Sequence, residues 1–295
     1  MAEPVWWRLS EAGLQDDIAS PEAIAAVRAM PGFQAAMEHS MRGALRLNDL
    51  DPIYYRTMND TALAVLGVLA LYLDATGGLW HQRLRDVAGF SGVLSTGRAS
   101  ALLMRMQSIG FVEAEKERAA GTPKFYRPTS RLTAAFRDRL RLELEAMSRI
   151  APDMEEHLAR FDAPGGFAAF MREYGKVVLK AVLTPSAPDL PMLAISSRRA
   201  GTIALIALVD AASTQAGHFP ATGPTRVSVA ALARRFGVSR THVLNLLRAA
   251  EAAGFIARDT ADGDIEVLPA LIDALEELYG LNYISAGASA HLALR

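Results

Sequence analysis

The sequence contains no cysteine, which excludes disulfide bonds, thiolate metal sites and cysteine nucleophiles. Aromatic residues are also scarce, whereas alanine and leucine are abundant, and such side chains lose little conformational freedom in a helix. The longest apolar runs, residues 61–73 and 202–209, are shorter than the roughly 20 residues that span a bilayer, so we interpret them as core helices. The N-terminus shows no signal-peptide pattern. We therefore expect a mainly α, cytoplasmic protein without a membrane segment.

Motifs of common enzyme sites are missing as well. The six histidines are scattered and show no metal-ligand spacing such as His-Glu-x-x-His. Gly89-Phe-Ser-Gly92 lacks the Gly-x-Ser-x-Gly pattern of a nucleophile elbow. Neither a phosphate-binding loop nor a dinucleotide fingerprint occurs. The sequence thus predicts a protein that is not an enzyme and that holds no metal or cofactor.

The small net charge of −1 conceals two basic segments. Residues 81–131 hold nine Lys or Arg and four Asp or Glu, and residues 227–258 hold five Arg and one Glu. The rest of the chain is therefore acidic. A local positive field on an acidic body can attract phosphates. An ordinary fluctuation of solvated charges would give the same pattern.

Two segments that lie 144 residues apart resemble each other. Residues 102–112 read LLMRMQSIGFV and residues 246–256 read LLRAAEAAGFI, so Gly110 falls on Gly254. Self-similarity at a fixed spacing indicates two copies of one structural unit. The second copy is preceded by residues 217–226, which are rich in Gly and Pro and are predicted to form a loop.

The second copy has the pattern of two helices joined by a tight turn. Residues 230–236 show helical spacing of apolar side chains, and Gly237 can adopt a left-handed backbone conformation at little cost. Ser239 is a suitable N-cap for a second helix. Helical spacing directs Val243 and Leu246 of this helix inward and leaves the polar residues on its outer side.

This stretch resembles the helix-turn-helix signature of DNA-binding proteins, with Ala233 at the helix contact, Gly237 at the turn and Val243 in the core. The resemblance implies that the second helix presents polar side chains to base edges. Arginine and asparagine suit guanine and adenine, respectively. The residues expected to face the groove are Arg240, Thr241, His242 and Asn245, with Ser239 at the helix start. Those expected to contact phosphates are Arg234, Arg235 and Arg248.

A strand–turn–strand pattern follows each copy and is typical of a β-hairpin. In the second copy this hairpin is acidic at its tip, with Asp259, Asp262 and Asp264, which departs from the basic wing expected along a phosphate backbone. In the first copy, residues 112–116 and 124–127 flank the turn. Its positive charge comes from Lys116, Arg118, Lys124 and Arg127.

The first copy, residues 84–109, is the weaker match, because Val93 stands where the second copy has its turn glycine. Its expected DNA-facing residues, besides those of the wing, are Ser95, Thr96, Arg98 and Arg105. Together the two copies resemble bacterial-type winged-helix transcriptional regulators of the MarR family. The resemblance implies tandem winged-helix domains in one chain, joined by a helical connector. It also implies binding to double-stranded DNA, as a pseudo-dimer within one chain or as a homodimer.

Five segments are predicted along the chain. They are an N-terminal helical segment (1–57), the first winged-helix domain (58–130), the helical connector (131–192), the second winged-helix domain (193–280) and a C-terminal tail (281–295). Apolar spacing and caps predict further helices over residues 21–30, 32–47, 131–150, 166–183 and 270–279. Residues 285–289 are small and polar and are expected to be loosely ordered.

Other interpretations of the same residues stay open. A winged helix can serve as a protein-interaction or scaffold module that reads no DNA. A small-molecule effector is a further hypothesis, based only on the amount of helix outside the two copies. His242 and the neighbouring Arg234 and Arg235 can equally belong to a solvated helix surface.

Overall fold

The computed structural model describes residues 20–51, 59–90, 96–115, 124–183, 191–258 and 264–294 of the 295-residue chain. The chain forms two compact units, each built from separate stretches of sequence. Unit 1 comprises Met1–Ala23, Ala62–Ala187 and Tyr283–Arg295, and unit 2 comprises Ile24–Thr61 and Pro188–Asn282. The described residues are mainly helical and contain two three-stranded antiparallel sheets, which confirms the predicted mainly α fold with small sheets.

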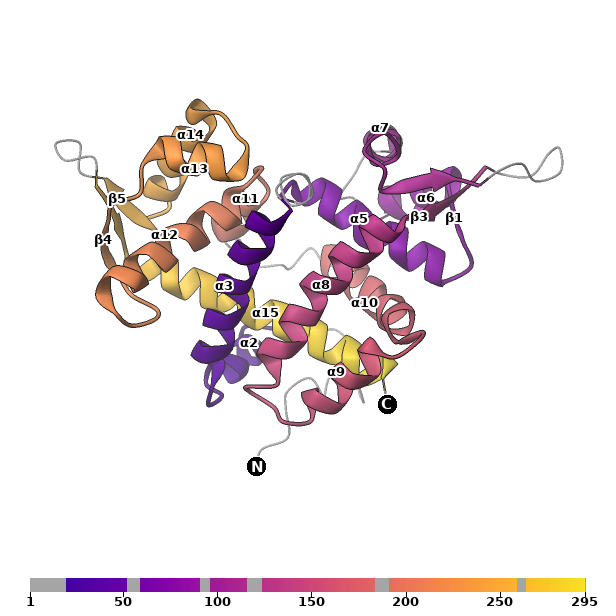
Figure 1. The fold of residues 1–295 in the computed structure, drawn as a ribbon, viewed down its shortest axis with the longest axis horizontal. Coiled ribbons are helices and arrows are strands. Elements are labelled where there is room, and N and C mark those ends of the chain that lie inside the picture. The colour runs from indigo at the N-terminus through magenta and orange to yellow at the C-terminus, as the bar shows by residue number, and fades with distance from the viewer. Residues whose placement is uncertain are drawn as a thin grey trace. The chain divides into compact units, whose positions relative to one another are not determined.

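The elements of unit 1 are, in chain order, α5 (Thr61–Ala75), β1 (Leu79–Trp80), α6 (His81–Phe90), α7 (Thr96–Ser108), β2 (Val112–Ala114), β3 (Phe125–Pro128), α8 (Ser130–Met147), α9 (Met154–Asp162) and α10 (Gly166–Leu183) (Figure 1). The predicted helices over 131–150 and 166–183 correspond to α8 and α10. For α10, both the first and the last residue agree with the prediction. Helices α5 and α10 approach closely at Gly175, which has no side chain. A Cβ added there would lie 2.4 Å from the Tyr72 side chain.

The elements of unit 2 are α3 (Phe33–Leu50), α11 (Pro191–Ser196), α12 (Gly201–Ala216), β4 (Gly223–Thr225), α13 (Val229–Phe236), α14 (Arg240–Ala252), β5 (Ile256–Arg258) and β6 (Ile265–Val267) (Figure 1). Two more helices, α2 (Pro21–Arg28) and α15 (Pro269–Ala293), contain residues of both units. The predicted cap of α2 is present, since Ser20 Oγ accepts a 3.1 Å hydrogen bond from the Ala23 amide.

Both units contain the same succession of helix, strand, two helices and two strands. This succession is α5-β1-α6-α7-β2-β3 in unit 1 and α12-β4-α13-α14-β5-β6 in unit 2. The sheets also share one strand order, β1-β3-β2 and β4-β6-β5, so the first strand pairs with the last. Strand β4 corrects the prediction that all of residues 217–226 form a loop. A strand of three residues is too short to show the alternation of apolar and polar side chains that identifies a strand in a sequence. Its conformation is determined by pairing with β6, which lies about 40 positions away in the sequence.

The C-terminal part of α15 contradicts the prediction of a short helix followed by a loosely ordered stretch. The helix continues to Ala293, and residues 283–291 are buried. Ser289 Oγ donates a 2.7 Å hydrogen bond to the Ser285 carbonyl, which satisfies that hydroxyl inside the protein. Small residues suggest a loop when they are exposed, but in a buried helix they permit close packing. The sequence does not reveal that burial.

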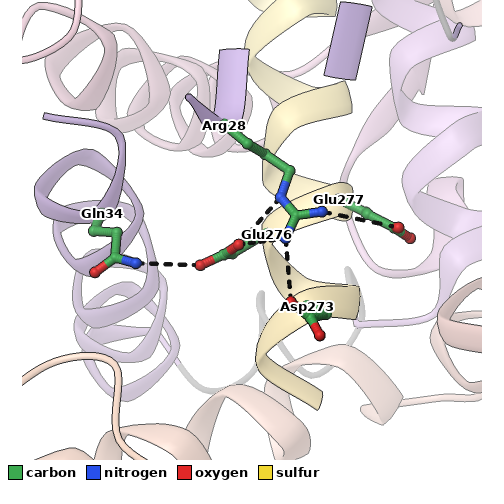
Figure 2. A network of polar contacts seen from close by, with 5 residues as sticks. All are labelled: Arg28, Gln34, Asp273, Glu276 and Glu277. Atoms are coloured by element: carbon green, nitrogen blue, oxygen red, sulfur yellow. Dashed lines mark hydrogen bonds and ion pairs between the residues drawn. The ribbon is translucent and has the colours of Figure 1, made fainter. Parts of the chain in front are cut away.

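A polar network anchors α2 and α3 to α15 within unit 2 (Figure 2). The Arg28 guanidinium donates to Glu276 through Nε at 3.1 Å and to Asp273 through Nη2 at 3.2 Å. It also lies 4.0 Å from Glu277, and Gln34 donates to the other oxygen of Glu276. Residues 21–34 are therefore joined to the start of α15, although more than 200 positions separate them.

Candidate nucleic-acid interface

The α13–turn–α14 segment of unit 2 has the local structure that its sequence predicts. Gly237 adopts the left-handed conformation, with φ 62° and ψ 40°, and its amide donates back to α13. Ser239 caps α14, since its Oγ accepts a 3.1 Å hydrogen bond from the His242 amide. The apolar face of α14 is buried, including Val243 and Leu246. The turn and the cap together fix where α14 begins.

The outer side of α14 carries four exposed polar side chains, here called the α14 face. They are Arg240, Thr241, Asn245 and Arg248. The side chains of Arg240 and Thr241 make no hydrogen bond or ion pair with any residue that the structure describes. Arg248 Nη1 donates to Asn245 Oδ1 at 3.0 Å. An amide oxygen accepts two hydrogen bonds, so Asn245 keeps one lone pair and its amino group for a ligand.

His242 does not belong to the α14 face, although the sequence predicted that it faces the groove. Its side chain is half-buried, and Nε2 donates to the Arg199 carbonyl oxygen at 2.8 Å. A carbonyl oxygen only accepts, so the proton must lie on Nε2. This hydrogen bond joins α14 to the segment between α11 and α12.

That segment adds two cations that the sequence analysis missed, Arg198 and Arg199. Both side chains are exposed, and Arg198 Nη1 donates to the backbone oxygen of Asn245 at 3.3 Å. The Arg198–Arg199 pair therefore lies next to the α14 face, although it precedes α14 by about 40 positions. Two adjacent arginines before a helix were a visible signal, but the sequence does not show which surface they adjoin.

The arginines of α13 differ from each other in their surroundings. Arg234 is exposed. Arg235 binds the Asp49 carboxylate at the end of α3 in two places, with Nε–Oδ1 at 3.1 Å and Nη2–Oδ2 at 2.8 Å. These hydrogen bonds hold the pKa of the Asp49 carboxyl below its usual value. The charge of Arg235 is thus already compensated by Asp49, which makes this arginine less suited to phosphate binding.

The hairpin of unit 2 forms as predicted, with β5 and β6 antiparallel. Its base carries an ion pair between Arg258 and Glu251, whose Nε–Oε2 distance is 3.0 Å. At the tip, Asp259 and Asp262 lie outside the described residues, while Asp264 is half-buried. The described part of this hairpin therefore offers no excess of positive charge.

In unit 1, α7 occupies the place in the succession that α14 has in unit 2, and three of its exposed residues lack strong hydrogen-bonding side chains. Gly97, Ala101 and Met104 are exposed, with Met104 at 71%. The predicted contacts Arg98 and Arg105 are exposed as well, and each interacts with a neighbouring group. Thr96 begins the helix, and Ser95 lies outside the described residues.

Part of the positive charge predicted for the hairpin of unit 1 is compensated by carboxylates. Arg127 Nε donates to Glu115 at 2.5 Å, and Asp74 is close enough to interact with both charges. Partial burial, more than the repulsion from Glu115, raises the pKa of Asp74, while Arg127 opposes that rise. Lys124 is exposed and lies 5.6 Å from the Tyr126 ring centre. Of the other predicted wing cations, Lys116 and Arg118 lie outside the described residues.

Two other kinds of site are absent from the described ranges. No three His, Asp or Glu side chains gather there in a way that could hold a metal ion. None of the helices described is both long and apolar enough to cross a membrane.

No protein-family model, curated protein or solved structure matches the chain. The function proposed below therefore rests on the chemistry and geometry of the α14 face and its surroundings.

Proposed function

We propose that this protein is a transcriptional regulator that binds double-stranded DNA and inserts α14 into the major groove. The observation that carries the proposal is the division of α14 into a buried apolar side and the exposed α14 face. A recognition helix needs both sides, because its back must pack on the protein while its front forms hydrogen bonds with base edges.

Arg240 and Asn245 are the residues with the chemistry for base reading. Arginine can donate two hydrogen bonds to guanine O6 and N7, and asparagine can pair with adenine N6 and N7. Arg240 is exposed and has no partner among the described residues, so its guanidinium is available without breaking a contact. Asn245 retains its amino group and one oxygen lone pair, which is the donor–acceptor combination that adenine requires.

Phosphate binding is assigned to the exposed cations around the α14 face. Arg248 lies on the helix itself, and Arg198 and Arg199 adjoin it. Phosphate contacts fix the register of a protein on the duplex and supply most of its salt-dependent affinity. The net charge of the whole chain is −1. A local basic patch can therefore attract DNA, while the acidic remainder of the chain opposes unspecific adhesion to polyanions.

The succession of elements also supports the proposal. A helix, a strand, two helices joined by a turn and a two-stranded hairpin occur in this order in both units. The MarR-type winged-helix resemblance of the sequence implies the same arrangement. The proposal includes a cytoplasmic location and action as a dimer. It is compatible with a small-molecule effector but does not require one.

The test is binding of the full chain to a random-sequence duplex library, followed by affinity measurements on the enriched and random DNA at several salt concentrations. Enrichment of one sequence class and an affinity that falls with salt are expected. Arg240→Ala and Asn245→Ala should each lower the preference for the enriched sequence by roughly 5- to 150-fold, the equivalent of about 1–3 kcal/mol per base contact.

Arg172→Ala on α10 is the control, since it removes an exposed positive charge from another element. It should leave the sequence preference unchanged. Equal, salt-independent retention of all DNA by the wild-type chain would contradict the proposed function.

One observation favours the second candidate, a protein-interaction module. Met104 is 71% exposed on α7, where a polar reading residue would be expected. Recovery of one stable protein partner, together with no salt-dependent binding to DNA, would support this candidate.

A further inference from the structure

We propose that base reading is confined to α14 and that α7 makes no base contacts, so that each chain specifies a single half-site. This inference rests on the proposed function and concerns the kind of DNA that the protein recognises. A chain with two reading helices would instead specify two half-sites by itself.

The two helices can be compared position by position, because the repeat has a constant spacing of 144 residues. Thr241, Asn245 and Arg248 of the α14 face correspond to Gly97, Ala101 and Met104 of α7. All six residues are exposed, so both sets present their side chains to solvent from equivalent places. The two sets therefore differ in the chemistry of their side chains and not in their exposure.

At these three positions α7 lacks the groups that distinguish base pairs, and its exposed arginines, Arg98 and Arg105, each interact with a neighbouring group. Glycine and alanine have no side-chain donor or acceptor, and the methionine thioether is a weak acceptor. Ala101 cannot replace the bidentate contact of Asn245, and Met104 replaces a guanidinium that has five donors.

Insertion of α7 into a groove would also be unfavourable. The base edges of the major groove carry hydrogen-bonding groups that are solvated in free DNA. Met104, at 71% exposure, would displace that water without replacing its hydrogen bonds. Burying a polar group without a hydrogen-bond partner is unfavourable.

The charges that surround the two helices also favour DNA binding at α14 over α7. The α14 face adjoins the exposed Arg198–Arg199 pair. In unit 1, the described cation of β3, Arg127, is bound to Glu115, with Asp74 close to both. The described base of this hairpin is thus locally neutral or acidic, which does not favour a close approach of phosphates.

The experiment that tests this inference introduces one negative charge at equivalent exposed positions of the two helices. Asn245→Glu should weaken binding to the enriched duplex by at least about tenfold, through repulsion and the loss of a base contact. Ala101→Glu should change it by less than about twofold, since it removes no base contact. Circular dichroism and thermal unfolding check that both variants are folded. If the Ala101→Glu variant does not fold, Met104→Glu is used in its place.

A second measurement counts the bases that each bound chain reads. Single-base substitutions across the enriched duplex, with the protein-to-DNA ratio determined by native mass spectrometry, should give one block of sensitive base pairs per chain. Two blocks per chain, or equal losses from Asn245→Glu and Ala101→Glu, would overturn this inference and leave the proposed function intact. A wild-type chain without any sequence preference would overturn both.

Discussion

At the scale of single residues, the contact between Arg235 and Asp49 decides how much charge the candidate interface offers. It joins α13 to the end of α3, and both of its hydrogen bonds are 3.1 Å or shorter. Both side chains are partly exposed, so the pair adds at most about 1 kcal/mol to the free energy of unfolding. Its larger effect is to remove one cation from those available to phosphates.

Asp49→Asn is therefore expected to strengthen binding to random duplex DNA, because it releases the charge of Arg235. The plot of log affinity against log salt concentration should become steeper by about 0.9, the contribution of one additional phosphate contact. Fluorescence anisotropy at four or five salt concentrations measures this slope. Asp138→Asn on α8 is the matched control, since Asp138 is exposed and the net charge changes equally. Identical slopes for the two variants would refute the expectation.

Part of this residue-level pattern follows from the sequence alone. Arg240 and Asn245 were expected to be exposed because helical spacing assigns neighbouring apolar residues to the core, and this is what the structure has. The engagement of Arg235 and the proximity of Arg198 to Asn245 were missed. These contacts join segments 186 and 47 positions apart, and no local pattern indicates which distant segments meet.

At the scale of elements, the turn between α13 and α14 depends on one backbone conformation. Gly237 has φ 62°, a region where a side chain with a Cβ is strained. Gly237→Ala should lower the free energy of unfolding by about 1–2 kcal/mol, whereas Gly237→Asn should cost less, because asparagine tolerates this conformation. Urea denaturation of the full chain measures both.

Gly97→Ala is the control for this prediction. Gly97 lies in α7 at an ordinary helical φ, and an added Cβ would meet nothing within 4 Å. The free energy of unfolding should be unchanged or rise by up to about 1 kcal/mol, since alanine is the better helix former. A similar loss of stability in Gly97→Ala and Gly237→Ala would show that the left-handed turn is not the cause.

The elements themselves were well predicted where local signals were strong. The start and end of α10, the cap of α14 and the turn glycine all follow from spacing or from a residue within three positions. Strand β4 and the last residues of α15 were not predicted, because pairing and burial, not local preference, determine their structure.

At the scale of the whole molecule, unit 1 joins α9 to the C-terminal end of α15 through buried polar groups. His157 and His291 are 8% and 4% exposed, and their ring centres lie 5.7 Å apart. Arg160 donates to the Leu294 carbonyl from the next turn of α9. Nδ1 of His157 is buried and has no hydrogen-bond partner among the described residues. The neutral form of this side chain therefore suits the site.

The stability of the chain should consequently fall in mild acid. Burial lowers the pKa of His157, assisted by Arg160 and opposed by a Leu294 backbone hydrogen bond and by Asp153 and Glu156. The unfolded chain takes up the proton near pH 6.5, before the folded one does. The stabilisation is thus complete above about pH 6.5 and is lost as the pH falls from there towards the lower folded pKa.

His157→Gln should weaken this pH dependence, because glutamine stays neutral and keeps a donor for the Leu294 carbonyl. Urea denaturation between pH 7.5 and 5 compares its stability profile with those of the wild type and of His218→Gln. His218 is exposed, so its replacement should follow the wild type. If His157→Gln loses as much stability in acid as the wild type, His157 is not the responsible group.

Local signals in the chain are enough to specify its framework, namely its mainly helical character, the repeat, the turn at Gly237 and the amphipathic helix that follows it. Apolar spacing, caps and glycine conformations act over a few residues, so they can be recognised in order along the chain. Packing between distant segments is what brings Arg198 next to Asn245, pairs Asp49 with Arg235 and buries Ser285 and Ser289. These properties arise where distant segments pack together, and their charges and burial depend on neighbours that no local pattern specifies.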